Sequence, residues 1–179
     1  MTPEAPTLAA PLDRAWIAAH IPHSGAMCLL DRVEAWDDTQ IRCLATSHLD
    51  THNPLRSNGQ LASVCGIEYA AQAMAVHGAL IAANGANVAK GADGTGGGAQ
   101  RPRAGFLASV RGVEAQVARL DTLDAPLIVE AERIGGDGTT VLYRFTLRCE
   151  ARVLMTGRAA VMLDASAAGA LRRPAIDNT

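Results

Sequence analysis

The longest run of hydrophobic and small residues in the sequence extends from Leu61 to Ala83. It is rich in Ala, Leu and Met, contains no Pro and is much longer than a strand, which predicts an α-helix. Apolar residues occupy every face of this helix, so we expect the rest of the protein to enclose it. Its one carboxylate, Glu68, would be costly there unless it is paired, protonated or used in chemistry. Glu68 is therefore the first candidate for a functional residue.

Before and after this segment in the sequence, the pattern changes to shorter stretches that are typical of a short helix and of strands. Leu12–His20 has helical spacing, and Val33–Ala45 alternates as two strands do, with a turn at Asp37-Asp38. In the sequence that follows the helix, GGDG at 135–138 predicts a hairpin turn. The four strands predicted in this half are Gly105–Val117, Leu127–Ile134, Val141–Glu150 and Arg152–Leu163. This order predicts an α+β protein in which an antiparallel sheet curls around the long helix.

The length of 179 residues and the 49% hydrophobic content are sufficient for one domain with its own core. We expect the core at about 21–163, with loose tails before and after it. Residues 85–103 contain GADGTGGG and predict a flexible connector. This glycine-rich segment lacks the Lys-Ser/Thr of a phosphate-binding loop, so no nucleotide role is expected.

Composition and charge exclude several classes of partner. The net charge is −2 and aromatic residues make up 3%, which argues against nucleic acid as a partner. The apolar helix contains Ser63, Glu68, Gln72 and His77 and lacks interfacial anchors, so we do not expect it to span a membrane. The four cysteines have no zinc or disulfide spacing, and the N-terminus is unlike a signal peptide. We therefore expect a cytoplasmic protein.

The polar segment 47–60 predicts a loop that leads into the long helix, with Ser57 or Asn58 as its N-cap. Two of the five histidines, His48 and His52, lie in this loop, where catalytic side chains are often found. None of the five has the spacing of a metal site, so no metal is expected. On the helix, Gln72 is one turn after Glu68 and could orient its carboxyl group. His77 is on the opposite side and is expected to be a satisfied core or interface residue.

Three segments resemble the FabZ/FabA-type 3-hydroxyacyl-[acyl carrier protein] dehydratases. They are IPHSGAMCLLDRV at 21–33, EYAAQ at 68–72 and FLASV at 106–110. The sequence of the helix, IEYAAQAMAVHGAL, most resembles that of the ApeP-like subgroup, which is linked to aryl-polyene biosynthesis. The resemblance implies a hotdog fold, no cofactor, and a substrate held on the phosphopantetheine of an acyl carrier protein. It also implies a homodimer or a heterodimer of paralogues, with the catalytic acid and base supplied by opposite subunits.

The resemblance assigns Glu68 to the position of the family's helical acid, but the GHFPG segment that carries the family's base is absent. HLDTHNPLRSNGQL stands in its place. His52 is sixteen residues before Glu68 and His48 is twenty before it, and the former is nearer to the family's spacing. We therefore expect His52 to be the base, with His48 as the alternative. His23, in the Pro-His pair of the first segment, is expected to be structural.

These residue types suit the elimination of water from a 3-hydroxyacyl thioester. A histidine can take the C2 proton, a carboxyl group kept protonated by apolar surroundings can donate to the leaving hydroxyl, and helix N-terminal N–H groups can stabilise the thioester oxygen. Two alternatives remain open. One is thioester hydrolysis on the same fold, and the other is a non-catalytic subunit that partners an active dehydratase.

Overall fold

The computed structural model describes residues 12–92, 105–137 and 139–163. Its elements follow the predicted order of a short helix, two strands, a long helix and four strands. The helices are α1 (Arg14–His20) and α2 (Gly66–Ala92), and single 3₁₀ turns occur at Gly25–Met27, Ser47–Leu49 and Ser63–Cys65. The strands are β1 (Arg32–Trp36), β2 (Gln40–Ala45), β3 (Phe106–Ala115), β4 (Leu127–Gly136), β5 (Thr140–Cys149) and β6 (Arg152–Met162).

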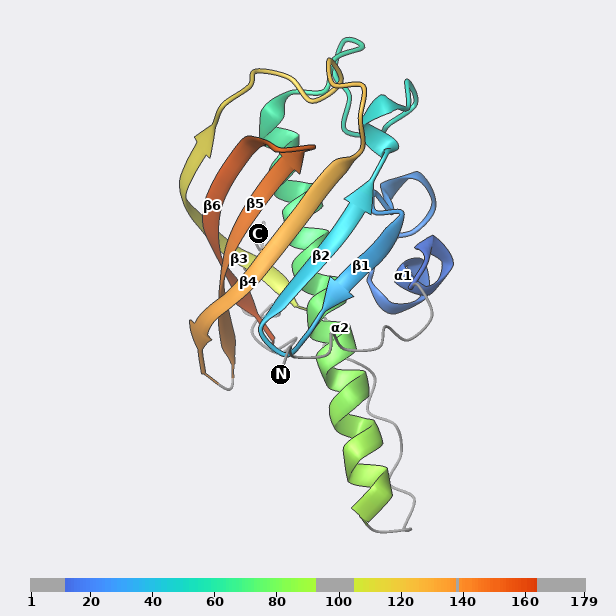
Figure 1. Ribbon diagram of the computed structural model, residues 1–179, viewed down its shortest axis with the longest axis vertical. Coiled ribbons are helices and arrows are strands. Elements are labelled where there is room, and N and C mark those ends of the chain that lie inside the picture. Colours follow the sequence, from blue (N-terminus) through green and yellow to red (C-terminus); the bar gives the residue numbers. More distant parts are fainter. Residues whose placement is uncertain (1–11, 93–104, 138, 164–179) are drawn as a thin grey trace, which may run out of the picture.

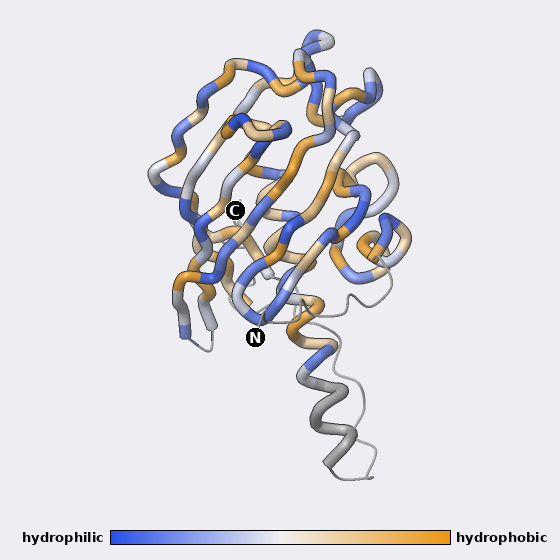
Figure 2. The backbone as a smooth tube through the Cα atoms, viewed as in Figure 1, coloured by the Kyte–Doolittle hydropathy of each residue, from blue (hydrophilic) through white to orange (hydrophobic). Residues whose placement is uncertain are grey.

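The six strands form one antiparallel sheet in the order β1-β2-β4-β5-β6-β3. The sheet curves around α2, whose C-terminal part continues beyond the sheet (Figure 1). Side chains on β5 alternate between the two faces, with Tyr143, Phe145 and Leu147 buried against the helix and Leu142 and Arg144 exposed. Hydrophobic and hydrophilic residues accordingly alternate along the strands (Figure 2). The predicted α+β arrangement is confirmed.

Helix α2 packs its apolar residues against β2, β4 and β5. Tyr69, Ala73 and Val76 have no exposed surface. At the first residue of the helix, a Cβ on Gly66 would lie 2.8 Å from Leu147 Cδ2, so a larger residue there would require this buried side chain to shift. The segment Ser63–Gly85 is long and apolar enough to cross a membrane, but 56% of its most apolar 18 residues are buried inside the protein, as in a core helix.

The ends of α2 differ from the prediction. Residues 61–63 first pair with residues 118–120 through backbone hydrogen bonds, so the helix begins only at Gly66. Ser57 and Asn58, the predicted N-caps, instead belong to a tight turn in which Ser57 and Gln60 exchange backbone hydrogen bonds. The helix also continues to Ala92, into the segment predicted as a flexible connector. Residues 93–103 of that connector lie outside the described residues.

Among the strands that the structure describes, β3 is at an edge of the sheet and pairs only with β6. Its ten residues are exposed or half-buried throughout, in contrast to the alternating burial of β5. Phe106, Leu107 and Val113 each expose more than a third of their surface. An exposed edge of this length with apolar side chains is a site at which another strand can pair.

Candidate functional site

Glu68 lies in the first turn of α2, on the side of the helix that contacts His23 of the loop between α1 and β1. The next residue, Tyr69, is fully buried, whereas the Glu68 side chain keeps 31% of its surface exposed. The expectation that apolar surroundings enclose this carboxyl group is therefore not met within the chain. The reason is that the loop between α1 and β1, rather than the sheet, covers this side of the helix.

Gln72, one helical turn after Glu68, ties this loop to the helix. Its side-chain oxygen accepts a hydrogen bond from the Leu29 backbone N–H at 2.9 Å. Its Nε2 donates to the Met27 carbonyl oxygen at 2.8 Å and to Glu68 Oε1 at 3.1 Å. Gln72 is fully buried, and these contacts satisfy its amide group. Its predicted role in orienting the Glu68 carboxyl group agrees with this contact.

His23 is the second partner of Glu68. Its Nε2 is 3.1 Å from Glu68 Oε1, and its side chain is 27% exposed. From its place in the Pro-His pair, His23 was expected to be structural, and no spacing pattern in the sequence connects it with Glu68, which is 45 positions away. The one available signal was the Pro-His pair in the segment that resembles the dehydratases. The structure thus brings an unanticipated imidazole to the predicted acid.

His52, the predicted base, lies at the surface of the loop before α2, and its side chain is 92% exposed. Its Nδ1 is 3.5 Å from Asp50 Oδ1 and 3.3 Å from Thr51 Oγ1. Within the described chain its recorded contacts are local, and none involves Glu68. A catalytic role for His52 therefore stays a prediction, and it would require the Glu68 of another chain.

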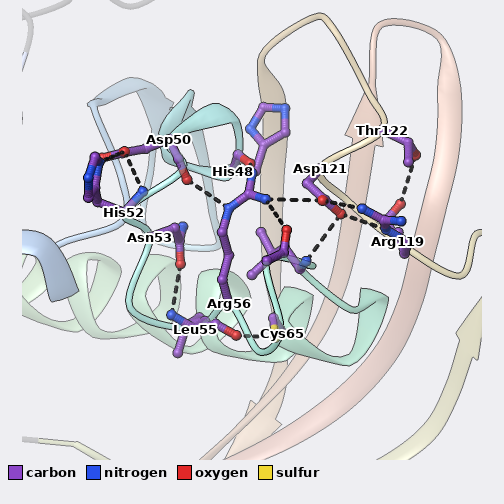
Figure 3. Close-up of polar contacts among 12 residues, drawn as sticks. His48, Asp50, His52, Asn53, Leu55, Arg56, Cys65, Arg119, Asp121 and Thr122 are labelled. Carbon is purple, nitrogen blue, oxygen red and sulfur yellow. Dashed lines mark hydrogen bonds and ion pairs between the residues drawn. The ribbon is translucent and has the colours of Figure 1, made fainter.

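The loop that carries His52 is held by Arg56 (Figure 3). Its guanidinium group donates to the backbone oxygens of His48, Asp50 and Gly59 and to the Asp121 carboxylate. Asp121 also accepts from the Leu61 backbone N–H and from Arg119, and the Arg119 hydrogen bond is the main reason that its pKa lies well below the usual value. The loop before α2 is therefore fixed to the β3–β4 connection.

The alternative base, His48, is fully buried beneath this loop. Its ring nitrogens face the backbone carbonyls of Leu123 and Ala125 but form no hydrogen bond of normal length within the described residues. Burial lowers the pKa of His48. The structure thus separates both loop histidines from Glu68 of the same chain, one because it points outward and one because it is enclosed.

His77 is a core residue near the middle of α2 and is fully buried. Its Nε2 is 2.7 Å from the Asp37 backbone oxygen, so this nitrogen donates, and its Nδ1 accepts from the Tyr143 hydroxyl at 3.0 Å. Burial lowers the pKa of His77 and raises that of Tyr143 to about 12. The prediction of a satisfied core histidine agrees with these contacts.

An antiparallel sheet wrapped around one long helix is the hotdog fold, and in this chain the helix carries a carboxylate in its first turn. The ApeP-like family model, described as ApeP dehydratase, matches residues 15–171. This chain belongs to the ApeP-like dehydratase family. No match was found among the curated proteins.

Two solved structures illustrate the fold. A chain of the dehydratase heterocomplex ApeI:P from Xenorhabdus doucetiae is 20% identical, with coverage of 88% of this chain and 97% of that chain and a TM-score of 0.63. The PaaI protein of the phenylacetic acid degradation operon of Escherichia coli is 11% identical, with coverage of 83% and 97% and a TM-score of 0.51. At these identities the likeness establishes the fold alone.

Proposed function

We propose that this protein is a subunit of a dehydratase that removes water from a 3-hydroxyacyl thioester and leaves the trans-2-enoyl thioester. The substrate is held on the phosphopantetheine of an acyl carrier protein, in the assembly of a fatty-acid-like or aryl-polyene chain. The observation that supports this proposal is the Glu68 carboxyl group, which His23 and Gln72 hold at the start of the central helix while leaving it open to solvent. Membership of the ApeP-like dehydratase family supports the reaction class.

In the proposed reaction Glu68 is the acid. It donates a proton to the C3 hydroxyl, which leaves as water, while a base removes a proton from C2 and the C2–C3 double bond forms. The N-terminal end of α2 carries a partial positive charge and suits the thioester oxygen, on which negative charge develops. No cofactor is needed for this chemistry.

The base is proposed to come from a second chain. Of the five histidines, His23 contacts the Glu68 carboxyl group of its own chain. His48 and His77 are fully buried, and His20 stacks on Trp16. His52 extends from the surface, as a residue that reaches across an interface would. The exposed apolar edge strand β3 offers a place for such a partner.

The proposal is tested by mass-spectrometric turnover of a 3-hydroxyacyl thioester, on carrier protein and on coenzyme A. We expect the wild type to release water, and Glu68→Gln to lose at least about a hundredfold in rate, as for removal of a general acid. His52→Ala is expected to be inactive alone, and a co-expressed hybrid of the two variants to regain turnover, because one site then keeps both groups. Thiol release in place of dehydration would contradict the proposal.

A second candidate is a subunit that completes the active site of a paralogous dehydratase, with the base on the paralogue. It is favoured by the position of His52, whose recorded contacts are all local. In that case the purified chain is inactive alone, a paralogue restores turnover, and His52→Ala has no effect on the pair. If this chain supplies the acid, Glu68→Gln still abolishes turnover by the pair. If Glu68→Gln has no effect on the pair, this chain is a non-catalytic subunit.

A further inference from the structure

The two oxygens of the Glu68 carboxyl group are not equivalent. Oε1 receives both recorded contacts, from His23 Nε2 and from Gln72 Nε2, each at 3.1 Å. Within the described part of the chain, Oε2 has no recorded hydrogen-bond partner, and the side chain is 31% exposed. Any group that approaches Glu68 from outside therefore finds Oε2 free and Oε1 occupied.

The donor from Gln72 is fixed by the backbone. The Leu29 N–H requires an acceptor, and the Met27 carbonyl requires a donor, so the amide can take only one of its two orientations. In that orientation the remaining Nε2 hydrogen points at Glu68 Oε1. Gln72 is thus a donor to this oxygen in either protonation state of the carboxyl group.

The donor from His23 follows from its other ring nitrogen. Nδ1 of His23 has no exposed surface and no hydrogen-bond partner among the described residues. A proton on Nδ1 would be a buried donor without an acceptor, which costs more than an unpaired lone pair. The neutral ring therefore carries its proton on Nε2 and donates it to Glu68 Oε1.

We infer that His23 is a positioning residue that, together with Gln72, restricts the exchangeable proton of Glu68 to Oε2. This inference rests on the proposed function and assigns it a reacting atom. In the elimination, the O–H bond at Oε2 breaks and its proton joins the C3 hydroxyl oxygen. The C3–O bond breaks with both electrons on oxygen, and the C2–H electrons form the C2–C3 double bond. The C2 proton goes to the base of the second chain, and return of one proton to Oε2 closes the cycle.

The two donors assist this step because Glu68 becomes a carboxylate as its proton leaves. A hydrogen bond to an ionised acceptor is stronger than one to a neutral acceptor, so both contacts strengthen as the C3–O bond breaks. Interactions that strengthen on the way to the transition state raise kcat rather than lower KM. The effect of losing His23 is therefore expected in kcat.

Three substitutions distinguish a positioning role of His23 from a role as the catalytic base. His23→Ala removes the donor, and we expect kcat to fall roughly tenfold or more with little change in KM. His23→Gln keeps an N–H at a similar distance from the backbone and is expected to stay within about threefold of wild type. His23→Asn, whose amide is one bond too short, serves as the matched control and should behave as His23→Ala. Thermal unfolding of each variant checks that the fold is retained.

If His23→Gln is as inactive as His23→Ala in a folded protein, His23 is the base itself and the inference is wrong. It is also wrong if His23→Ala keeps the full kcat. A readout that does not depend on activity is the ¹⁵N spectrum of the histidine rings. We expect the neutral His23 ring to be protonated at Nε2 in the wild type, and a ring protonated at Nδ1 would overturn the inference. An inactive wild type would reject the proposed function, while this spectrum would still decide the role of His23.

Discussion

Helix α2 carries two polar contacts that involve histidines, and they differ in how completely their groups are paired. Around His77, the imidazole, the Tyr143 hydroxyl and the Asp37 carbonyl are joined, and the histidine has no exposed surface. Around Glu68, His23 and Gln72 occupy one carboxyl oxygen, and nearly a third of the side chain is exposed. The first contact ties the helix to the β1–β2 turn and to β5, and the second ties it to the loop before β1.

The difference separates a structural polar group from a functional one. A buried group that is fully paired contributes to stability and to the uniqueness of the core, and it has no capacity left for a substrate. A carboxyl group with one oxygen held and the other free is oriented without being consumed, which is what an acid needs. Both contacts appear in the sequence as polar residues in an apolar helix, so burial alone does not identify the functional one.

The largest expected effect on stability tests this comparison directly. His77→Ala leaves the buried Tyr143 hydroxyl without its partner and opens a cavity in the core, and we expect about 3 kcal/mol of lost unfolding free energy. Glu68→Ala is the matched variant on the same helix and should cost less than about 1 kcal/mol, because His23 is partly exposed and Gln72 keeps its hydrogen bonds with Met27 and Leu29. Urea denaturation of both proteins measures the difference. Equal losses would show that Glu68 is as structural as His77.

The fold could be predicted because its elements depend on local patterns. The alternation on β5 and the long apolar stretch of α2 are set by residue type, and the turn residues at 37–38 and 135–137 mark the hairpins. The start of α2 could not be predicted, because backbone pairing with residues 118–120, far away in the sequence, holds residues 61–63 outside the helix. Propensity alone does not contain that contact.

The candidate site likewise contains residues that the sequence predicts and one that it does not. Glu68 was found because a lone carboxylate in an apolar helix is unusual, and Gln72 because it is one turn away. His23 was missed because its approach to Glu68 depends on how the loop between α1 and β1 folds back onto α2. The exposure of Glu68 depends on which face of the helix the sheet covers. Composition of the helix, which is apolar all round, does not determine that face.

A smaller effect is expected where the loop before α2 is anchored. Asp121 is almost fully buried and accepts from Arg56, from Arg119 and from the Leu61 backbone N–H. We expect Asp121→Ala to cost about 2 kcal/mol, because it leaves buried donors unpaired. Arg119 is more than a third exposed, so Arg119→Ala is the matched control and should be close to wild type in urea denaturation.

The same variant sharpens the comparison between the loop and the helix. Because Arg56 fixes the segment that carries His52, Asp121→Ala should also increase amide hydrogen exchange in residues 47–62. Exchange around His77 should stay unchanged. If exchange increases equally in both regions, the loop and the helix unfold as one unit and the anchor is not local.

The smallest expected effect is the dependence of stability on pH that the buried histidines create. Burial lowers the pKa of His77 and of His48 from the ordinary value of 6.5. In the unfolded chain these rings bind protons at a higher pH than in the folded chain. The stability that their neutral forms contribute is therefore complete above about pH 6.5 and is lost as the pH falls toward the folded values.

Other charged groups face these two rings. Asp37, Asp38 and Arg133 lie near His77, and Arg56 and Asp31 lie near His48. Hydrogen bonds from Thr39 and Gln40 hold the pKa of Asp37 at about 2, from an ordinary 3.8, so its own contribution is lost only below about pH 4. The interval between pH 7 and pH 5 therefore reports on the histidines rather than on this carboxylate.

Each buried histidine can add up to about 1.4 kcal/mol per pH unit to the slope of unfolding free energy in this interval. We expect the wild type to lose stability steadily from pH 7 to pH 5 in urea denaturation, and His48→Leu to lose less. Since the His48 ring has no hydrogen-bond partner in the part of the chain that the structure describes, that variant should be near wild type in stability at pH 8. A slope that is unchanged in His48→Leu would show that the ring accepts a proton without leaving its buried position, with the Leu123 and Ala125 carbonyls as its acceptors.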